Sequence, residues 1–194
     1  MSTTETLKKA FFALEKAEKK IAQLEMVQRE PVAIIGMACR FPGGINTPQA
    51  FWDFLKNGQD GIIEVPDERW DIDAFYDPNP DAINKMYTRH GAFLPDIGLF
   101  DAPFFGFSPR EALRLDPQQR LFIETTWKAL EDAGIAVEKL AGSATGVFVG
   151  IMSDDYLERQ LIADANCCND PYLLIGSSSS AAASRHRPVH QKGV

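Results

Sequence analysis

The sequence contains few of the residues that most often build disulfides, metal sites and acid–base centres. Its 194 residues include only three cysteines and three histidines. Cys39 stands alone, and Cys167 and Cys168 are adjacent, so the spacing predicts neither a disulfide framework nor a paired Cys-x-x-Cys metal site. We therefore expect a protein of a reducing, cytoplasmic compartment.

Long apolar runs and phosphate-binding glycine motifs are also missing. No apolar stretch approaches the roughly 18 residues that a membrane-spanning helix needs. The first residues continue into a charged repeat rather than an apolar segment, which excludes a secretory signal peptide. Neither Gly-x-Gly-x-x-Gly nor a P-loop follows the apolar segment at 32–35, so we exclude nucleotide binding at the loop after it.

Basic residues are outnumbered, with 20 Lys and Arg against 27 Asp and Glu and a net charge of −7. The imbalance lies in residues 31–184, which carry −11, whereas residues 1–30 carry +1 and residues 185–194 carry +3. A phosphate-binding surface needs clustered Lys and Arg, so the composition disfavours a nucleic-acid partner. The 45% hydrophobic content predicts a globular protein.

Residues 1–30 predict a helical segment with an apolar seam. Six side chains fall on the a and d positions of about three heptads: Leu7, Ala10, Leu14, Ala17, Ile21 and Leu24. Glu30-Pro31 ends the helix. The pattern fits a short parallel coiled coil, although a solvated helix that merely caps the next domain would also show it. Three heptads are marginal alone, so pairing would need support from the sequence C-terminal to the helix.

The segment Asp116–Gly134 predicts a long amphipathic helix. Asp116 is a suitable N-cap, Pro117 fits the first helical position, and Gln119 stands where a capping box places a side-chain amide. Gly134 provides a left-handed C-terminal stop. Helix formation does not require Gln118, Arg120 or Trp127, so these residues need another explanation.

The rest of the chain predicts an α/β protein. Val32–Ile35 and Gly146–Val149 have the continuous apolar pattern of buried strands. A short helix is expected over 47–57, capped by Thr47, and residues 58–110 form a loop-rich stretch. The small residues of 176–183 indicate a closely packed helix, with a flexible linker as the alternative.

Three segments in the same order, 31–44, 89–112 and 116–134, resemble the β-ketoacyl synthase (ketosynthase) domain of modular type I polyketide synthases. The run Asp-Pro-Gln-Gln-Arg-Leu from Asp116 is similar to the signature helix of that family. The resemblance implies the N-terminal portion of an incomplete thiolase-like α/β/α/β/α fold, preceded by a helical coiled-coil segment. It divides the chain into a docking helix at 1–30, ketosynthase sequence at 31–184 and a divergent tail at 185–194.

The resemblance also implies a function and partners. The parent enzyme would catalyse decarboxylative Claisen condensation of acyl and malonyl-type thioesters carried on the phosphopantetheine of acyl carrier protein. It would work as a homodimer and receive the upstream synthase subunit, with Leu7, Leu14, Ile21 and Leu24 forming the dimerisation and docking seam. Neither nucleic acid nor membrane is an expected partner. The alternative is a dimeric docking or interaction module without catalysis, and an unrelated α/β protein is the remaining possibility.

The chemistry of that family uses one nucleophilic cysteine, in an Asp-Thr-Ala-Cys-Ser-Ser context, and two histidines. All three would follow Val194 in family order, so we predict no catalytic, cofactor-binding or metal-binding residue in this chain and no condensation activity for it alone. Cys39, Cys167 and Cys168 lack the nucleophile context, and His90 fits a surface loop. Two carboxylate clusters, Asp67/Glu68 with Asp71/Asp73 and Asp154/Asp155, lack cation-site spacing and are interpreted as solvated.

The resemblance ends at Arg185. The residues from there to Val194 are basic and without periodicity, and Pro188 separates His186 from His190, which argues against a helical zinc pair. We interpret this tail as the product of a shifted or prematurely ended reading frame or of a cloning artefact. A genuine alternative tail is the less favoured explanation. Without the neighbouring strands of the complete fold, the two apolar strands would be left as exposed edges, so we predict low solubility or molten behaviour.

Overall fold

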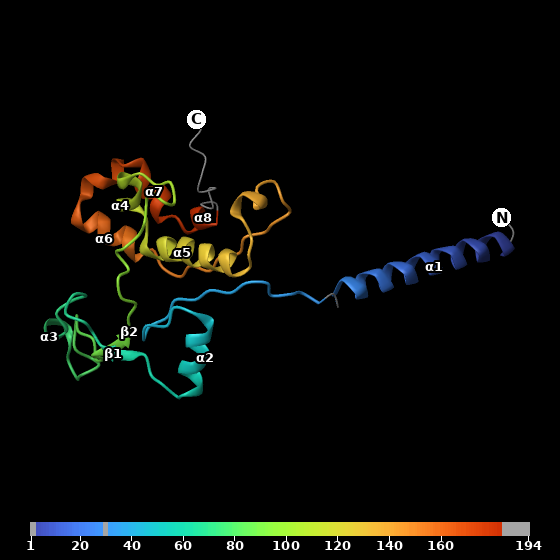
Figure 1. Ribbon diagram of the computed structural model, residues 1–194. Coiled ribbons are helices and arrows are strands. Elements are labelled where there is room, and N and C mark those ends of the chain that lie inside the picture. The colour runs from blue at the N-terminus through green and yellow to red at the C-terminus, as the bar shows by residue number, and fades with distance from the viewer. Residues whose placement is uncertain (1–2, 29–30, 184–194) are drawn as a thin grey trace. The chain divides into compact units, whose positions relative to one another are not determined.

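The computed structural model describes residues 3–28 and 31–183 (Figure 1). Its internal contacts divide the chain into two units, one ending at Ile34 and the other beginning at Ile35. The first unit contains helix α1, Thr3–Gln28. The second unit contains, in order, α2 (Pro48–Lys56), β1 (Ile62–Glu64), α3 (Ile72–Phe75), β2 (His90–Ala92), α4 (Pro109–Arg114), α5 (Pro117–Asp132), η1 (Val137–Leu140), α6 (Asp155–Ala163), η2 (Ala165–Asn169), α7 (Pro171–Ser177) and α8 (Ser179–Ala182).

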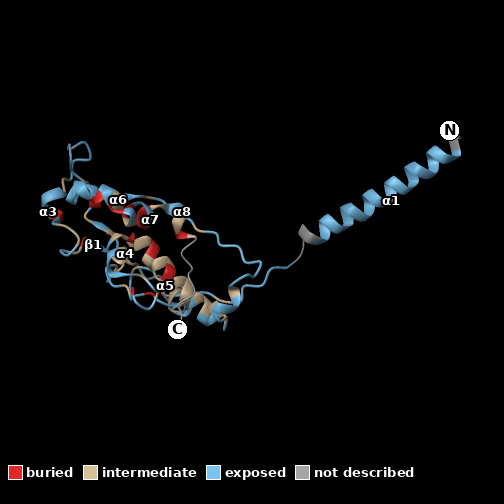
Figure 2. Ribbon diagram, turned by 90° about the horizontal axis from the view of Figure 1, so that it is seen from above, coloured by how far each residue is buried: buried red, intermediate tan, exposed pale blue. Residues whose placement is uncertain are grey.

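Helix α1 confirms the uninterrupted helix expected near the N-terminus. It runs for 26 residues, and Glu15 and Lys19 form an i,i+4 ion pair of 2.9 Å along its exposed surface. The apolar seam of this helix is also exposed, as the pale blue ribbon of Figure 2 shows. The helix therefore brings a full row of apolar side chains into contact with solvent.

The helices α4 to α8 form the best-packed part of the second unit. Helix α4 packs on α7, and α6 packs on η2 and α7, while α5 lies alongside this group (Figure 1). The two largest completely buried apolar side chains belong here: Leu115, directly before α5, is 0% exposed and Leu173 of α7 is 1% exposed. We call α4, α5 and α6 to α8, residues 109–134 and 155–183, the helical cluster.

Helix α5 begins and ends as the sequence predicts. The Asp116 side chain accepts a hydrogen bond from the Gln118 N–H, Pro117 occupies the first turn, and Gly134 has a left-handed φ of 65°. The capping box predicted for Gln119 is wrong. Its side chain is buried and donates to the Ser178 carbonyl, and the Asp116 N–H that a capping box would use donates to the Gly176 carbonyl instead.

Helix α2 confirms the short helix expected over 47–57, with the Thr47 hydroxyl accepting from Ala50 N–H at 3.1 Å. The loop-rich stretch is also confirmed. Within it, β1 and β2 form an antiparallel pair in which Ile62 faces Ala92 and Glu64 faces His90. Among the described residues this two-stranded sheet is the one named sheet.

The two buried strands predicted at Val32–Ile35 and Gly146–Val149 are wrong for this structure. Both segments are free of regular secondary structure, and Val32 and Phe148 are 91% and 95% exposed. A strand is defined by a hydrogen-bonded neighbour, and in the described part of the chain neither segment has one. The apolar pattern was that of a strand, but the partner that would bury it is not supplied by residues 31–183.

The small-residue helix predicted over 176–183 is present only in part. Helix α7 ends at Ser177 and α8 begins at Ser179, because Ser178 adopts an extended conformation with ψ of 122°. The Ser178 carbonyl accepts a hydrogen bond from the Gln119 side chain at 3.0 Å. This tertiary hydrogen bond accompanies a break that local sequence propensity does not indicate.

Candidate functional site

The site of interest is the start of α5, where the signature residues of the sequence lie. Asp116 is 3% exposed, and its backbone N–H donates to the Gly176 carbonyl of α7 at 3.0 Å. Its carboxylate accepts from Gln118 N–H at 2.7 Å. Burial raises the pKa of Asp116, and the hydrogen bonds from Gln118 oppose that rise without cancelling it. One residue thus caps α5 and joins it to α7.

The next three side chains attach α5 to three different segments. The Gln118 amide donates to the Ser153 carbonyl before α6 at 3.0 Å, and the Gln119 amide donates to Ser178 at the same distance. Arg120 donates from Nε to the Leu115 carbonyl at 2.8 Å. These contacts explain why Gln-Gln-Arg follows the cap, which helix propensity alone does not.

Arg120 also reaches outward from the helix. Its Nη2 donates to the Tyr156 hydroxyl of α6 at 3.3 Å, and its guanidinium lies 5.9 Å from the centre of the same ring. The Tyr156 hydroxyl in turn donates to the Leu113 carbonyl of α4 at 2.9 Å. Arg120 therefore links α5, α6 and α4 through one tyrosine.

A second polar group joins α4, α6 and α7. Asp170 caps α7 and pairs with Arg114 at 3.2 Å and with Arg110 at 3.4 Å, while Arg114 also donates to the Gln160 side chain at 3.2 Å. Burial alone would raise the pKa of Asp170, but the hydrogen bonds from Tyr172 N–H, Arg114 and Arg110 outweigh it and lower that pKa. The carboxylate is held charged by its neighbours.

Two glycines allow backbone contacts that no larger residue would permit. A Cβ at Gly176 would lie 2.3 Å from the Arg114 carbonyl oxygen, and one at Gly36 would lie 2.4 Å from the Ala129 carbonyl oxygen of α5. Next to Gly36, Met37 N–H donates to Asp132 at 2.9 Å. The segment after Ile35 is therefore fixed to the C-terminal end of α5.

Trp127 explains the aromatic loop that precedes α4. Its ring packs edge-on against Phe104 and Phe105, at centroid distances of 5.0 Å and 6.3 Å. Phe100 stacks on Phe105 at 5.3 Å, which extends the same group. The signature helix thus holds the loop at 100–107 on one side while its N-terminus holds α7 and α8.

The three cysteines lie in different surroundings. Cys39 is half-buried, Cys168 is exposed, and the buried Cys167 donates from Sγ to the Gln160 carbonyl at 3.5 Å. His90, the one histidine within residues 31–183, belongs to strand β2, where its N–H donates to the Thr88 hydroxyl at 3.3 Å. No hydrogen bond joins a described cysteine to a described histidine.

The predicted carboxylate clusters have ordinary structural roles. Asp71 caps α3, and Asp73 pairs with Arg89 at 2.7 Å, an ion pair that raises the pKa of Arg89 together with the one to Glu64. Asp154 precedes α6 without a side-chain capping bond. No group of three or more His, Cys, Asp or Glu side chains suited to a metal is found in the described ranges. His186 and His190 lie outside them.

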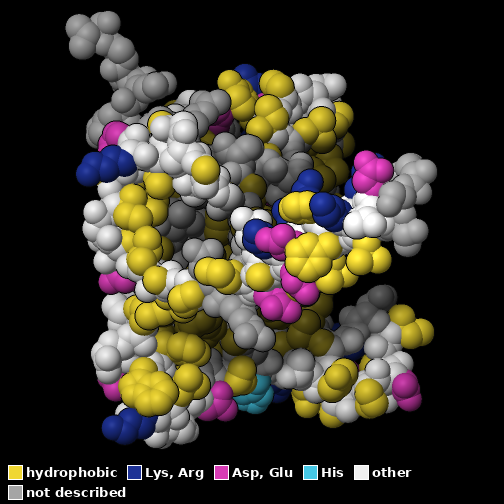
Figure 3. Space-filling view, turned by 90° about the vertical axis from the view of Figure 1, so that its right-hand side faces the viewer, with side chains coloured by type: hydrophobic (Ala, Val, Ile, Leu, Met, Phe, Trp, Pro, Cys, Tyr) yellow, Lys and Arg dark blue, Asp and Glu magenta, His cyan; other side chains and the backbone are white. Residues whose placement is uncertain are grey.

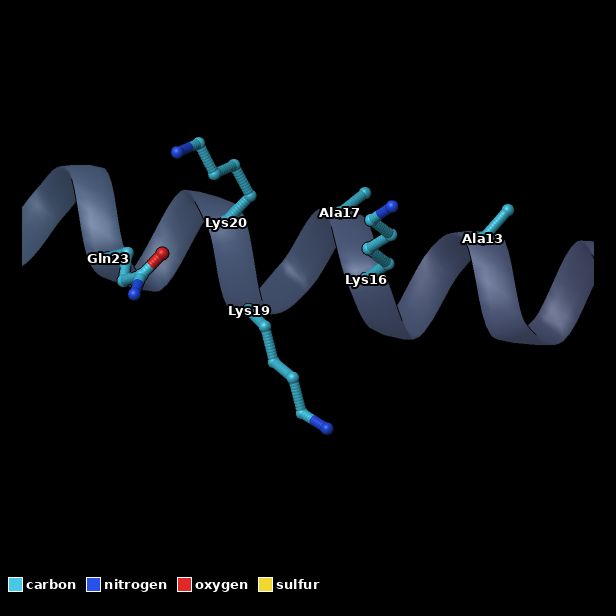
Figure 4. A pocket seen from close by; sticks show the side chains of 6 residues that line it. All are labelled: Ala13, Lys16, Ala17, Lys19, Lys20 and Gln23. Carbon is cyan, nitrogen blue, oxygen red and sulfur yellow. The ribbon is translucent and has the colours of Figure 1, made fainter.

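The predicted docking residues all lie on α1 and are all exposed. Leu7 is 72% exposed, Leu14 62%, Ile21 55% and Leu24 54%. A shallow hollow of about 630 Å³ runs along the same helix, lined by Ala13, Lys16, Ala17, Lys19, Lys20 and Gln23 (Figure 4). It is open to solvent, and its lining holds neither an acid–base pair nor a nucleophile.

The cluster around Asp170 was missed at the level of sequence, although a signal for it exists. Asp170-Pro171 repeats the Asp-Pro cap of Asp116-Pro117, and both carboxylates cap helices through the N–H two residues on. Pairing of the second cap with Arg110 and Arg114 depends on the crossing of α4 and α7, which no local pattern indicates. The close contact of Gly176 with the Arg114 carbonyl was likewise not indicated by the sequence, which shows only that the residue is small.

Comparison with known sequences identifies the class of this protein. The model of the family described as "Beta-ketoacyl synthase, N-terminal domain" matches residues 29–186, which is most of the chain. The chain belongs to this family, and its relatives place it among the ketosynthase domains of modular type I polyketide synthases. The match reaches two residues beyond the predicted boundary at 184.

The curated relatives are long polyketide synthases. The chain is 48% identical to Polyketide synthase GfsB of Streptomyces halstedii over 182 residues, which is 93% of this chain and 3% of that protein. It is 46% identical to Pikromycin polyketide synthase component PikAII of Streptomyces venezuelae over 92% of this chain and 5% of that one. Both alignments cover more than residues 29–194, so they extend into α1.

Solved structures give the same fold. The oxazolomycin ketosynthase domain OzmH KS7 of Streptomyces albus JA3453 matches with a TM-score of 0.70 and 39% identity, over 81% of this chain and 27% of that domain. The ketosynthase from module 6 of the bacillaene synthase of Bacillus subtilis 168 matches with a TM-score of 0.62 and 36% identity, over 79% and 23%. The N-terminal portion of a thiolase-like ketosynthase fold is thereby confirmed, and the chain spans about a quarter of these neighbours.

Proposed function

We propose that this chain is the N-terminal part of a ketosynthase whose parent joins an acyl group to a malonyl-type unit by decarboxylative Claisen condensation. The observation that carries the proposal is the family match over 29–186 together with the structural match to ketosynthase domains. In the parent, both substrates would be thioesters on the phosphopantetheine of acyl carrier protein. The parent would be a cytoplasmic homodimer.

The proposed reaction needs groups of a defined kind. A cysteine thiolate attacks the acyl thioester and releases the carrier thiol, which leaves the acyl group on the enzyme. Loss of carbon dioxide from the malonyl-type thioester produces an enolate, which two histidines and backbone N–H groups stabilise. The enolate carbon then attacks the acyl-enzyme, and the cysteine leaves as a thiolate.

We infer that the residues of this chain position that chemistry and do not perform it. Gln118, Gln119 and Arg120 each bind backbone carbonyls or a tyrosine of neighbouring segments, which is a structural use of polar groups. The buried Cys167 is bonded to a carbonyl rather than to a base.

The test is acyl transfer to the full chain. Incubation with an acyl N-acetylcysteamine thioester, followed by intact-mass measurement, should leave the mass unchanged. Iodoacetamide serves as the control reagent, because the exposed Cys168 should be alkylated and so show that thiols are reduced and available. A stoichiometric acyl adduct that maps to Cys39, Cys167 or Cys168 would overturn the proposed inactivity.

A second function, dimeric docking through α1, is favoured by a separate observation. Leu7, Leu14, Ile21 and Leu24 are each more than half exposed on one side of a helix, which is unfavourable for a helix that remains single in water. The alignments with two synthase subunits reach into this helix. We propose that α1 dimerises and receives the upstream subunit, as in modular synthases.

Sedimentation of the full chain tests the docking proposal. We expect a concentration-dependent dimer that is lost when Leu14 and Ile21 are both changed to Ser. Met26 is 77% exposed and lies off the heptad seam, so Met26→Ser is the matched control and should leave the dimer intact. A monomer at all concentrations would exclude dimeric docking and leave the ketosynthase proposal untouched.

A further inference from the structure

The pair Asn57-Gly58 lies where helix α2 ends, and Asn57 is the one asparagine of the sequence that a glycine follows. Asn57 is the C-cap of α2, and Gly58 has a left-handed φ of 62°. Both residues are exposed, and a Cβ placed on Gly58 would meet no atom within 4 Å. Asparagine is one of the chemically labile residues of proteins. The end of α2 therefore places a labile side chain beside an unobstructed backbone nitrogen.

We propose that Asn57 is a site of spontaneous covalent modification, in which its side-chain amide is converted to a carboxylate. The backbone nitrogen of Gly58 attacks Cγ of Asn57, and the new C–N bond closes a five-membered cyclic imide. The bond from Cγ to the side-chain nitrogen breaks, and that nitrogen leaves as ammonia with the proton of the Gly58 N–H. Water then opens the imide. Breakage of the bond to Cγ gives aspartate, and breakage of the bond to the backbone carbonyl carbon gives isoaspartate.

The last turn of α2 must open before this step can occur. Gly58 N–H donates to the Leu55 carbonyl, and Gln59 N–H donates to the Phe54 carbonyl, both at 3.1 Å. A ψ of 1° at Asn57 keeps the Gly58 nitrogen within this turn. Helix α2 contains no buried residue, so fraying of its end costs little beyond these two hydrogen bonds. The site is therefore closed only weakly.

The other five asparagines are each followed by a residue that carries a side chain. They are Asn46, Asn79, Asn84, Asn166 and Asn169. A side chain on the following residue crowds the approach of its nitrogen to Cγ, whereas glycine leaves that approach open. After Asn79 the residue is Pro80, which has no N–H to give up. These five asparagines serve as references within the same molecule.

The modification changes the C-terminal end of α2 in two ways. It adds a negative charge beside the last helical carbonyls, which already carry partial negative charge, so the final turn becomes less stable. The isoaspartate form also lengthens the main chain by one carbon between residues 57 and 58, which disrupts the two closing hydrogen bonds. The ring of Phe54 packs from this turn against Gly43 and Gly61, at 3.2 Å and 3.5 Å from a Cβ placed on each. The modified chain should lose part of this packing.

Ageing of the full chain tests the site. The chain is incubated at mildly alkaline pH, and peptide mapping records at each asparagine the mass gain that accompanies replacement of an amide by a carboxylate. We expect this gain at Asn57 first, together with a second peptide of the same mass that contains isoaspartate. In urea, where α2 is unfolded, the rate at Asn57 should rise about 30-fold, because the two hydrogen bonds no longer oppose the reaction.

Asn57→Gln is the matched control. It keeps a neutral amide at the same exposed position, but its longer side chain would have to close a less favourable six-membered ring. The peptide that contains residue 57 should therefore keep its mass in this variant. A mass gain there in Asn57→Gln would place the reaction at another side chain and overturn the proposal.

Hydrogen exchange connects the modification to α2. Backbone amides of residues 51–59 should exchange faster in the aged chain than in the fresh one, whereas aged Asn57→Gln should exchange as it did before ageing. Faster exchange that accompanies the mass gain at Asn57 supports the proposal. Modification at Asn57 that is no faster than at the five reference asparagines of the native chain contradicts it.

Discussion

The helical cluster and the two apolar segments at 32–35 and 146–149 use similar residues with opposite results. In the cluster, Leu115 and Leu173 are fully buried, and polar groups at both helix caps are bonded. In the two segments, Val32 and Phe148 are almost completely exposed. Apolar character is common to both regions, so the difference lies in the presence of packing partners.

The reason lies in how far away those partners are in sequence. A helix satisfies its backbone within itself, and the helices of the cluster find packing partners among one another, as α4 does on α7. A strand satisfies its backbone only through a neighbour. Figure 3 shows many apolar side chains on the face it presents.

Removing core volume from the helical cluster should have the largest effect. Leu115 is 0% exposed, so Leu115→Ala should lower the stability of the cluster by about 2–5 kcal/mol, measured from the hydrogen exchange of α5 and α7 amides. Leu113→Ala is the matched control, because Leu113 is 64% exposed in the adjoining helix. Equal effects of the two changes would show that Leu115 is not a core residue.

Filling the close contact between α4 and α7 should be the next most damaging change. Gly176→Ala places a Cβ against the Arg114 carbonyl, and since backbone must move, we expect a loss of about 1–3 kcal/mol by the same exchange measurement. Gly150 has open space around it, and Gly150→Ala should be close to neutral. An unchanged exchange rate for α4 and α7 in Gly176→Ala would contradict this packing.

The two aspartate caps should respond to pH in opposite directions. Asp170 has a lowered pKa, so it adds stability that is present above its ordinary value of 3.8 and lost as the pH falls below it. Asp116 has a raised pKa because it is buried. The folded state therefore loses stability as the pH rises above the ordinary value of 3.8 and the carboxyl group must ionise. Asparagine at either position keeps the capping oxygen and removes the titration.

Acid unfolding of the two variants tests this contrast. Asp170→Asn should make the loss of stability between about pH 5 and pH 3 shallower, and Asp116→Asn should make it steeper. The readout is cluster stability by helical circular dichroism in urea at each pH. The same slope in both variants would mean that the two carboxylates do not differ in environment.

Polar substitution in the exposed segments should have the smallest effect on folding. Val32→Ser and Phe148→Ser remove apolar surface that is already in water, so each should change cluster stability by less than about 0.5 kcal/mol. Each should raise the concentration at which the chain begins to aggregate, as judged by light scattering. A marked loss of stability would show that these side chains are packed after all.

Local chemistry was predictable from the sequence wherever it acts over a few residues. The caps at Thr47 and Asp116 and the left-handed stop at Gly134 depend on adjoining backbone, and all three are confirmed. The break at Ser178 was not predictable, because the Gln119 amide that binds it comes from 59 residues away. The same limit applies to the strand at 32–35, whose pattern was read correctly as apolar but whose partner could not be located.

Family membership followed from three collinear motifs, but the role of the signature helix needed the structure. The sequence left Gln118 and Arg120 without an explanation, and their bonds to Ser153 and Tyr156 show that they join α5 to the segment before α6 and to α6 itself. The pairing of Asp170 with Arg114 lay beyond sequence reasoning, since it depends on the crossing of two helices. No helix in the described part of the chain is long and apolar enough to span a membrane.

The most direct test of the contrast is hydrogen–deuterium exchange of the full chain at neutral pH. The amides of α5 and α7 should exchange slowly, and those of residues 32–35 and 146–149 should exchange at nearly the rate of an unstructured peptide. A second fragment, taken from a complete ketosynthase domain and starting at the position that follows residue 186 in the alignment, would supply the missing strands. Its addition should slow exchange in the two segments if they form strands once they are paired. Slow exchange in these segments for the chain alone would contradict the account.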